Sequence, residues 1–316
     1  LLELEITLKK ESKHIIRGVK TMNIEYEQIR KKLAERSVKL PDGTQVPALG
    51  QGTWYMGENP NTWQEEVQTL RTGIELGMTL IDTAEMYGDG NAERLVGEAI
   101  RGKRDDVFLV SKVYPHNAGR NRIKQACENS LKRLGTDYLD LYLLHWRGMV
   151  PLAVVIEGME QLKEEGKILR WGVSNLDTDD MIELVNCPDG RNCTVNQVLY
   201  HLGSRGIEYD LLPWQRDNHI PVMAYSPLAQ GGTLRHHLLT HPIIKDLAEK
   251  KEVEPYQILL AWCIRTNEII AIPKASKVEH VIANAKAASV QFTDKELEKL
   301  NHAFPAPDRK VPLDII

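Results

Sequence analysis

One pattern recurs along most of the chain and limits its fold more than any other feature. A short apolar run is followed by a turn and then by a longer stretch of helical periodicity, which is typical of parallel βα units. About 265 residues for eight such units match the size of a (β/α)8 TIM barrel, which we therefore predict. The eight runs span residues 48–53, 79–82, 107–112, 139–145, 169–175, 195–198, 222–225 and 269–273.

The rival architecture is an open, doubly wound sheet with helices on both faces. Such a sheet usually carries a glycine-rich phosphate-binding turn directly after its first strand. No GxGxxG pattern follows the first run at residues 48–53. The sequence therefore favours the barrel.

Two segments precede the first unit of the barrel. The runs 38–40 and 45–47 flank a Pro-Asp-Gly-Thr turn and predict a β-hairpin that closes the barrel bottom. Residues 1–36 are rich in Lys and Arg, with loose helical periodicity, and predict an extension that is partly helical or flexible. A weakly amphipathic helix is one interpretation, but the sequence favours a basic arm that adds little to the core, and Met22 is a candidate start. We expect residues 37–316 to form the barrel domain.

Composition excludes several classes of function. The chain has 44 acidic and 40 basic side chains, a net charge of −4, so nucleic acid and anionic membranes are not expected partners. No apolar stretch is long enough to span a bilayer, and no secretory signal is recognisable at the N-terminus. The four cysteines form no CxxC pair and suit a reducing, cytoplasmic compartment. The histidines at 236, 237 and 241 lack the spacing of a tetrahedral site, so no metal is expected.

Polar residues stand where the apolar runs end. In a (β/α)8 barrel, the carboxyl ends of the strands gather at one rim, where catalytic residues lie. We therefore expect the polar residues that end these runs to meet there. They are Asp82, Lys112, His145, Asn175 and Gln197, with Tyr87 a few residues beyond Asp82.

An Asp, a Lys, a Tyr and a His at one rim form a specific chemical set. A buried Lys112 beside Tyr87 is expected to lower the phenol pKa, and Asp82 to keep the lysine charged. A neutral His145 would orient a carbonyl group, so Tyr87 becomes a general acid for a carbonyl oxygen. Two alternatives stay open: a purely structural Asp–Lys pair, and a lyase that uses Lys112 as a Schiff-base nucleophile.

These residues lie in motifs that resemble the aldo-keto reductase superfamily from about Val38 to the C-terminus. Residues 77–88, GMTLIDTAEMYG, are similar to its G-x-x-x-x-D-T-A-x-x-Y-G motif. Four further segments, 110–113, 139–146, 166–175 and 272–274, resemble its later signatures in the same order. The runs 50–57 and 200–210 resemble a bacterial branch of monomeric reductases that act on methylglyoxal and other small aldehydes.

The resemblance implies roles for particular residues. It implies a catalytic tetrad of Asp82, Tyr87, Lys112 and His145, with Tyr87 as the acid. It also implies binding of NADP(H) without a Rossmann domain. The cofactor residues would be Ser174, Asn175 and Gln197 at the carboxamide, Tyr225 against the nicotinamide ring, Ser226, Pro227 and Leu228 at the pyrophosphate, and Lys274, Ser276, His280 and Asn284 near the adenosine.

Two details of the resemblance concern selectivity. NADP-dependent relatives usually have an Arg where this chain has His280, so we expect a preference for NADPH that is less sharp than with Arg. The substrate pocket would be walled by Trp54, Tyr55 and Trp146 beside His145. The short loops predict an open, shallow pocket for small aldehydes, and Pro305–Ile316 is expected to cross the barrel top as an irregular strap.

The resemblance implies NADPH-dependent reduction of small aldehydes and ketones, such as methylglyoxal, to alcohols. The expected partner is a small-molecule carbonyl substrate, and the expected state is a monomer. The alternative is a regulatory or interaction subunit of the same fold that binds the cofactor with little turnover. Its only support in the sequence is the extension at residues 1–36.

Overall fold

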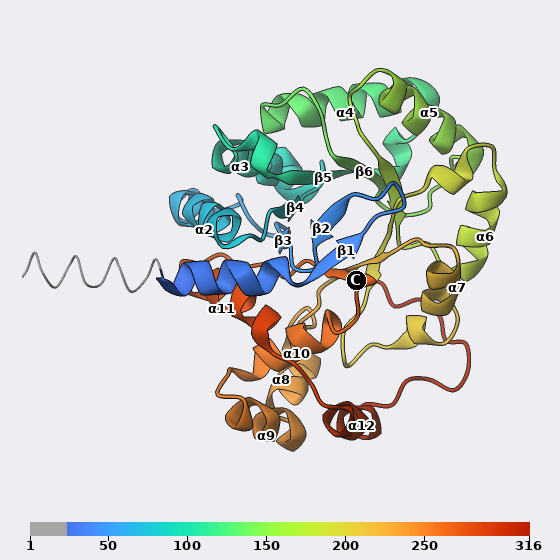
Figure 1. The fold of residues 1–316 in the computed structure, drawn as a ribbon. Coiled ribbons are helices and arrows are strands. Elements are labelled where there is room, and N and C mark those ends of the chain that lie inside the picture. The colour runs from blue at the N-terminus through green and yellow to red at the C-terminus, as the bar shows by residue number, and fades with distance from the viewer. Residues whose placement is uncertain (1–23) are drawn as a thin grey trace, which may run out of the picture.

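Eight parallel strands form the centre of the computed structural model, which describes residues 24–316 (Figure 1). Each strand pairs in parallel with the next one along the chain. Hydrogen bonds from Gly50 N to Ala271 O (2.8 Å) and from Gly52 N to Pro273 O (3.1 Å) join the first strand to the last. The predicted (β/α)8 barrel is thus confirmed. Its strands are β3 (Gln51–Gly52), β4 (Leu80–Asp82), β5 (Phe108–Val113), β6 (Leu141–Leu144), β7 (Trp171–Ser174), β8 (Asn196–Leu199), β9 (Val222–Tyr225) and β10 (Ile269–Ala271).

Helices surround these strands (Figure 1). The strands are buried on nearly every residue, because helices cover their outer face and side chains fill the barrel. This double burial explains why the strands appear in the sequence as continuous apolar runs. The helices are α2 (Trp63–Leu76), α3 (Asn91–Ala99), α4 (Arg120–Leu134), α5 (Leu152–Glu164), α6 (Thr178–Asn186), α7 (Leu211–Asp217), α8 (Gly232–Thr240), α9 (Pro242–Lys250), α10 (Pro255–Cys263), α11 (Val278–Lys286) and α12 (Asp294–Ala303).

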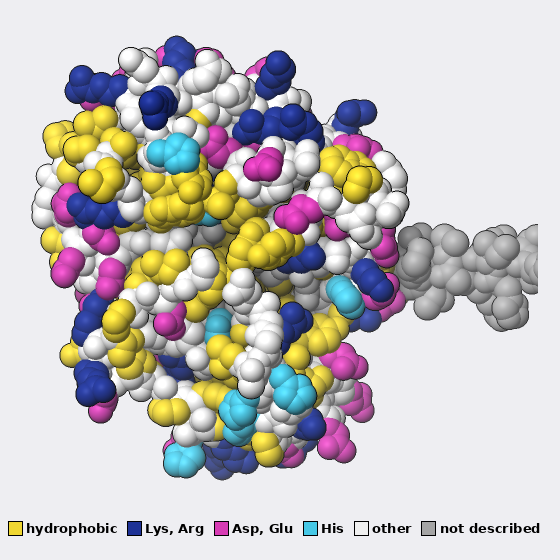
Figure 2. Space-filling model, turned by 180° about the vertical axis from the view of Figure 1, so that it is seen from behind, with side chains coloured by type: hydrophobic (Ala, Val, Ile, Leu, Met, Phe, Trp, Pro, Cys, Tyr) yellow, Lys and Arg dark blue, Asp and Glu magenta, His cyan; other side chains and the backbone are white. Residues whose placement is uncertain are grey.

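The predicted hairpin lies at the amino ends of the strands. Strands β1 (Ser37–Lys39) and β2 (Gln45–Pro47) pair antiparallel. Arg170 directly precedes β7, and its guanidinium donates to Asp42 Oδ2 and Thr44 Oγ1, both at 2.6 Å. The hairpin therefore covers the bottom of the barrel, as predicted, and crosses its centre in Figure 1. Figure 2, the view from behind, faces the opposite end, where hydrophobic side chains gather across the middle of the surface.

Part of the N-terminal extension belongs to the packed body of the protein. Residues 24–34 are helical, and Ile29 and Leu33 are buried in the core. The Arg30 guanidinium donates to Glu75 O at 2.8 and 3.1 Å, next to the end of α2. The expectation that this segment adds little to the core is wrong for residues 24–34. Residues 1–23, with the candidate start at Met22, lie outside the described residues.

Two further observations concern composition-based expectations. Within residues 24–316, no helix combines the length and the apolar character that crossing a membrane requires. The same residues contain no group of three or more His, Cys, Asp or Glu side chains placed to hold a metal ion. The four cysteines are free thiols, and three of them are buried.

Candidate active site

The barrel brings the strand-end charges into contact. Asp82 ends β4 and Lys112 lies on the neighbouring strand β5, so the parallel pairing places both at the same end of the barrel. Lys112 Nζ donates to Asp82 Oδ2 at 2.7 Å, to Thr83 O at 2.8 Å and to Tyr87 Oη at 3.2 Å. The lysine side chain is fully buried and that of Asp82 is 3% exposed. Burial lowers the pKa of Lys112, and the Asp82 carboxylate opposes that shift.

Tyr87 is held as a neutral phenol. Its pKa lies well above the ordinary value, first because the ring is buried and second because of the Asp82 carboxylate. The sequence-based expectation that Lys112 lowers this pKa is therefore wrong. The reason is that Asp82 compensates the lysine charge at 2.7 Å, which leaves burial as the dominant effect on the phenol. A protonated Tyr87 is the form that a proton donor requires.

His145 stands beside the phenol as a neutral imidazole. It follows β6, and its ring meets that of Tyr87 edge to face with centroids 5.6 Å apart. Burial, with the Lys112 charge as a second cause, lowers the pKa of His145 to about 2. Within residues 24–316, its Nδ1 atom is buried without a hydrogen-bond partner. A neutral imidazole at this place can hydrogen-bond a carbonyl oxygen without adding charge.

A chain of amides and hydroxyls continues from this group across β7, β8 and β9. Gln197 Nε2 donates to Asp82 Oδ1 at 2.8 Å, which fixes the second carboxylate oxygen. Ser174 Oγ donates to Gln197 O at 2.8 Å. Tyr225 Oη donates to Asn175 Oδ1 at 2.8 Å, and Asn175 Nδ2 donates to His145 O at 3.2 Å. The structure thus brings these predicted cofactor residues next to the predicted tetrad.

The ends of β4, β6, β7, β8 and β9 open into one cavity of about 430 Å³, whose lining does not include Lys112 of β5. Four of its non-glycine residues have left-handed backbone conformations: Tyr55 (φ 61°), Asn175 (58°), Ser226 (48°) and Ala229 (57°). Such conformations are costly for residues with a Cβ and cluster at functional sites. The predicted residues that line the cavity are Trp54, Tyr55, Asp82, Tyr87, His145, Trp146, Ser174, Asn175, Gln197, Tyr225, Ser226, Pro227, Leu228 and Lys274.

Aromatic rings form the wall on the tetrad side. Trp54 stacks on Tyr55 with centroids 4.6 Å apart and lies 6.4 Å from the Tyr87 ring. Trp146 lies 4.9 Å from the His145 ring. The predicted aromatic residues therefore surround the phenol and the imidazole. They leave an apolar space above them that suits a small organic molecule.

Two cations also line the cavity. Arg235, in α8, and Lys274, after β10, line it. Among residues 24–316, neither of these cations takes part in an ion pair. Two uncompensated cations beside the loop 226–232 fit an anionic group such as a phosphate. The donor set of this cavity therefore fits a nicotinamide dinucleotide.

Besides the fully buried Lys112, three predicted residues lie outside the set that lines the cavity. Ser276 precedes α11, and His280 and Asn284 lie on that helix, where Asn284 is buried and His280 is exposed. Conversely, Arg235, Met86 and the tail residues Ile315 and Ile316 line the cavity without having been predicted. Arg235 follows the glycine pair at 231–232 in the first turn of a helix, a position that could have drawn attention to it.

Residues 48–304 match the family model described as "Aldo/keto reductase family". The chain belongs to this family. As an aldo/keto reductase it is an oxidoreductase, in agreement with the sequence analysis.

Individual relatives agree with this assignment. The chain is 54% identical over 284 residues to methylglyoxal reductase YeaE of Escherichia coli, covering 90% of this chain and all of the relative. Two crystal structures of an aldo/keto reductase from Klebsiella pneumoniae, one with NADP and acetate and one with NADPH, are each 56% identical to it. Both superpose with a TM-score of 0.87, over 89% of this chain and 99% of theirs.

Proposed function

We propose that this protein reduces small aldehydes, including methylglyoxal, to alcohols with NADPH, as a cytoplasmic monomer. The observation that carries the proposal is that Tyr87, a partly buried phenol with a raised pKa on the wall of the cavity, contacts Lys112 Nζ at 3.2 Å. A neutral phenol beside a cation can give up its proton, because the cation stabilises the phenolate that remains. The family, and a relative that bears the name methylglyoxal reductase, support the choice of substrate class.

The chain's own residues would carry the proton. Tyr87 transfers its phenolic proton to the carbonyl oxygen of the substrate, and the phenolate then regains a proton from water. Lys112 stabilises the phenolate, and Asp82 holds the lysine charged and in place at 2.7 Å. Neutral His145 donates a hydrogen bond to the same oxygen and orients the carbonyl group. Trp54 and Trp146 shield the reacting group from water.

Another set of residues would hold NADPH. When bound, NADPH supplies the hydride for the carbonyl carbon. Ser174, Asn175 and Gln197 would bind the carboxamide, and Tyr225 would support the ring. The loop 226–232 with Arg235 and Lys274 would bind phosphate groups, as the uncompensated cations there indicate. Ser276, His280 and Asn284 would contact the adenosine end. NADP and NADPH in the related Klebsiella structures support this choice of cofactor.

The proposal is tested by following the absorbance of reduced nicotinamide with the purified chain. Methylglyoxal is the substrate, and NADPH and NADH are compared at equal concentrations. We expect turnover with both cofactors and a higher kcat/KM for NADPH, because Lys274 and Arg235 attract the additional phosphate. Equal values would contradict the cofactor preference. Tight NADPH binding without turnover of any small aldehyde would contradict the reductase and support the regulatory-subunit alternative.

A further inference from the structure

The turn that carries Tyr87 has a costly backbone conformation. This turn, η1 (Tyr87–Gly90), lies between β4 and α3, and we name it the Tyr87 turn. Three successive residues in it are left-handed: Gly88 (φ 53°), Asp89 (51°) and Gly90 (85°). Asp89 has a Cβ, and such a conformation persists only where surrounding contacts hold it. The support must therefore come from the elements that pack against the turn.

A buried ion pair lies against the end of the Tyr87 turn. Glu93, in the first turn of α3, accepts a hydrogen bond from Nε of Arg133, in the last turn of α4. The Glu93 side chain is fully buried and that of Arg133 is 19% exposed. Gly90 lies so close to the arginine that an added Cβ would stand 2.6 Å from Arg133 Cδ. The pair thus supports the point where the turn passes into α3.

The same carboxylate also reaches the strand that carries Lys112. Ser111 Oγ donates to Glu93 Oε1 at 2.6 Å, and Ser111 is fully buried. Ser111 directly precedes Lys112 on β5, and successive side chains of a strand point to opposite faces. Glu93 therefore holds β5 from the side of the helices, while Lys112 meets Tyr87 on the inner side. One carboxylate joins the supports of both partners in that contact.

Glu93 also acts on Lys112 through its charge. Burial lowers the pKa of Lys112, and Asp82 and then Glu93 oppose that shift. The titratable groups that face the lysine within the described residues are Asp82 from β4, Glu93 from α3, Tyr87 from its turn and His145 after β6. Lys112 donates to Asp82 and not to Glu93. A change at Glu93 therefore alters the charge nearby without breaking the ion pair of the tetrad.

Resting on the proposed function, we propose that Glu93 and Arg133 are positioning residues for proton donation. They hold the Tyr87 turn and β5 so that the phenol meets both Lys112 and the carbonyl oxygen of the substrate. Neither Glu93 nor Arg133 lines the cavity, so neither touches the substrate. Their loss should lower kcat, which depends on the proton donor, and leave KM and NADPH affinity nearly unchanged.

The test compares Glu93→Gln with the wild type in the methylglyoxal assay between about pH 6 and 9. The variant keeps the shape of the side chain and removes its charge. We expect kcat to fall about ten-fold, with KM and the Kd of NADPH, measured by fluorescence quenching, within about two-fold. The alkaline limb of kcat should move to lower pH by about one unit, because one anion fewer faces Lys112. Hydrogen exchange of residues 87–92 should become faster.

A second variant keeps the test decisive if the unpaired arginine unfolds Glu93→Gln. The double variant Glu93→Gln with Arg133→Met removes the pair as a whole, so no lone charge stays buried. Its alkaline limb should return toward that of the wild type, because the lost anion and the lost cation compensate each other. Its kcat should stay about ten-fold low, since the Tyr87 turn is still without its ion pair.

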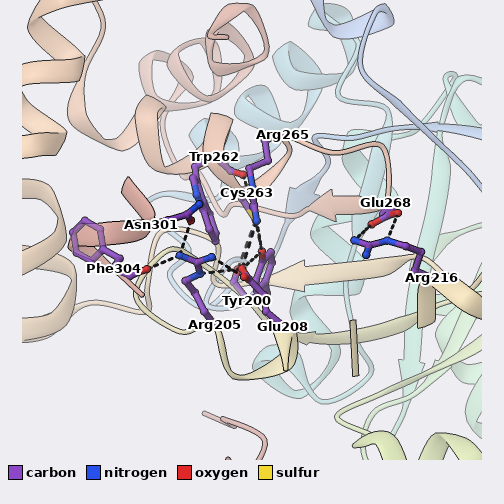
Figure 3. A network of polar contacts seen from close by, with 10 residues as sticks. All are labelled: Tyr200, Arg205, Glu208, Arg216, Trp262, Cys263, Arg265, Glu268, Asn301 and Phe304. Carbon is purple, nitrogen blue, oxygen red and sulfur yellow. Dashed lines mark hydrogen bonds and ion pairs between the residues drawn. The ribbon is translucent and has the colours of Figure 1, made fainter. Parts of the chain in front are cut away.

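The network in Figure 3 contains the matched control, Glu208→Gln. Glu208 resembles Glu93, because it accepts hydrogen bonds from a hydroxyl group, Tyr200 Oη at 2.6 Å, and from an arginine, Arg205 at 2.7 and 3.0 Å. None of these three residues of the network lines the cavity or faces Lys112. Glu208→Gln should therefore lose stability as Glu93→Gln does, yet keep kcat and its pH profile.

Two results would overturn the proposal. One is an unchanged kcat and pH profile in Glu93→Gln and in the double variant. The other is an equal change in Glu208→Gln, which would mean that lost stability alone lowers the activity. A wild type that reduces no aldehyde would overturn the proposed function and the role in proton donation with it. That outcome is distinct, because the first two results require an active wild type.

Discussion

At the scale of residues, the contact between Asp82 and Lys112 determines both stability and chemistry. Both side chains are buried. If either one is replaced by a neutral residue, the other remains as a buried charge without a partner. We predict that Lys112→Met lowers the free energy of unfolding by about 3–5 kcal/mol. The double variant Asp82→Asn with Lys112→Met should regain most of that stability, because no lone charge remains, yet stay inactive. Urea unfolding and a reductase assay on the same samples measure both effects, and a reactivated double variant would contradict the roles assigned.

His145 gives a prediction about pH. Its pKa is about 2 in the folded protein and 6.5 ordinarily, so between these values the unfolded chain binds more protons than the folded one. Stability must therefore fall as the pH drops below 6.5, by about 1.4 kcal/mol per pH unit from this group alone. We measure the free energy of unfolding in urea at pH 5, 6 and 7. It should depend less steeply on pH for His145→Gln than for the wild type or for His302→Gln, a change at an exposed histidine. The same pH dependence of the free energy of unfolding in all three proteins would contradict the conclusion that His145 is buried as a neutral imidazole.

Single residues also mark the limit of prediction from sequence. Asp82, Lys112 and His145 could be found because each directly follows or ends an apolar run, and the barrel geometry brings such positions together. The pKa of Tyr87 was predicted in the wrong direction, because sequence gives neither depth of burial nor the distance from Asp82 to Lys112. Ile315 was missed since its place at the cavity depends on contacts from distant segments.

At the scale of elements, close packing between helices depends on small residues that sequence periodicity does not reveal. Gly97 on α3 faces the end of α4, and a Cβ there would stand 2.6 Å from Leu134 O. We predict that Gly97→Ala destabilises the protein by about 1–3 kcal/mol, although alanine favours helices. Gly119→Ala is the control, because nothing lies within 4 Å of its Cβ position. Equal stabilities of the two variants in urea unfolding would contradict the packing described.

The strands and the hairpin were predicted well because their signals are local. Parallel strands buried on both faces appear as continuous apolar runs, and the turn at Pro41–Thr44 marks the hairpin. Helix 24–34 was less clear, since its apolar contacts are made to residues far along the chain. The polar contact of this helix is equally distant in sequence, because the Arg30 guanidinium donates to Glu75 O, and local periodicity cannot reveal such a partner.

At the scale of the whole molecule, the packed body begins earlier than the predicted boundary at residue 37. Leu33 is 2% exposed within the core, and Ile24, on the same helix, is 48% exposed. We predict that Leu33→Ala lowers the free energy of unfolding by about 2–4 kcal/mol. Ile24→Ala should change it by less than about 0.5 kcal/mol. Equally small effects for both variants would mean that the helix is peripheral to the barrel.

The central claim is that the barrel assembles one catalytic group from separate strands, with Tyr87 as its acid. The most direct test is Tyr87→Phe, assayed with NADPH and methylglyoxal. Its control is Tyr138→Phe, because the ring of Tyr138 packs against Arg104 and does not line the cavity. We predict that kcat of Tyr87→Phe falls by at least about 100-fold with little change in NADPH affinity, and that Tyr138→Phe keeps wild-type turnover. Turnover of Tyr87→Phe within a few-fold of the wild type would contradict the account.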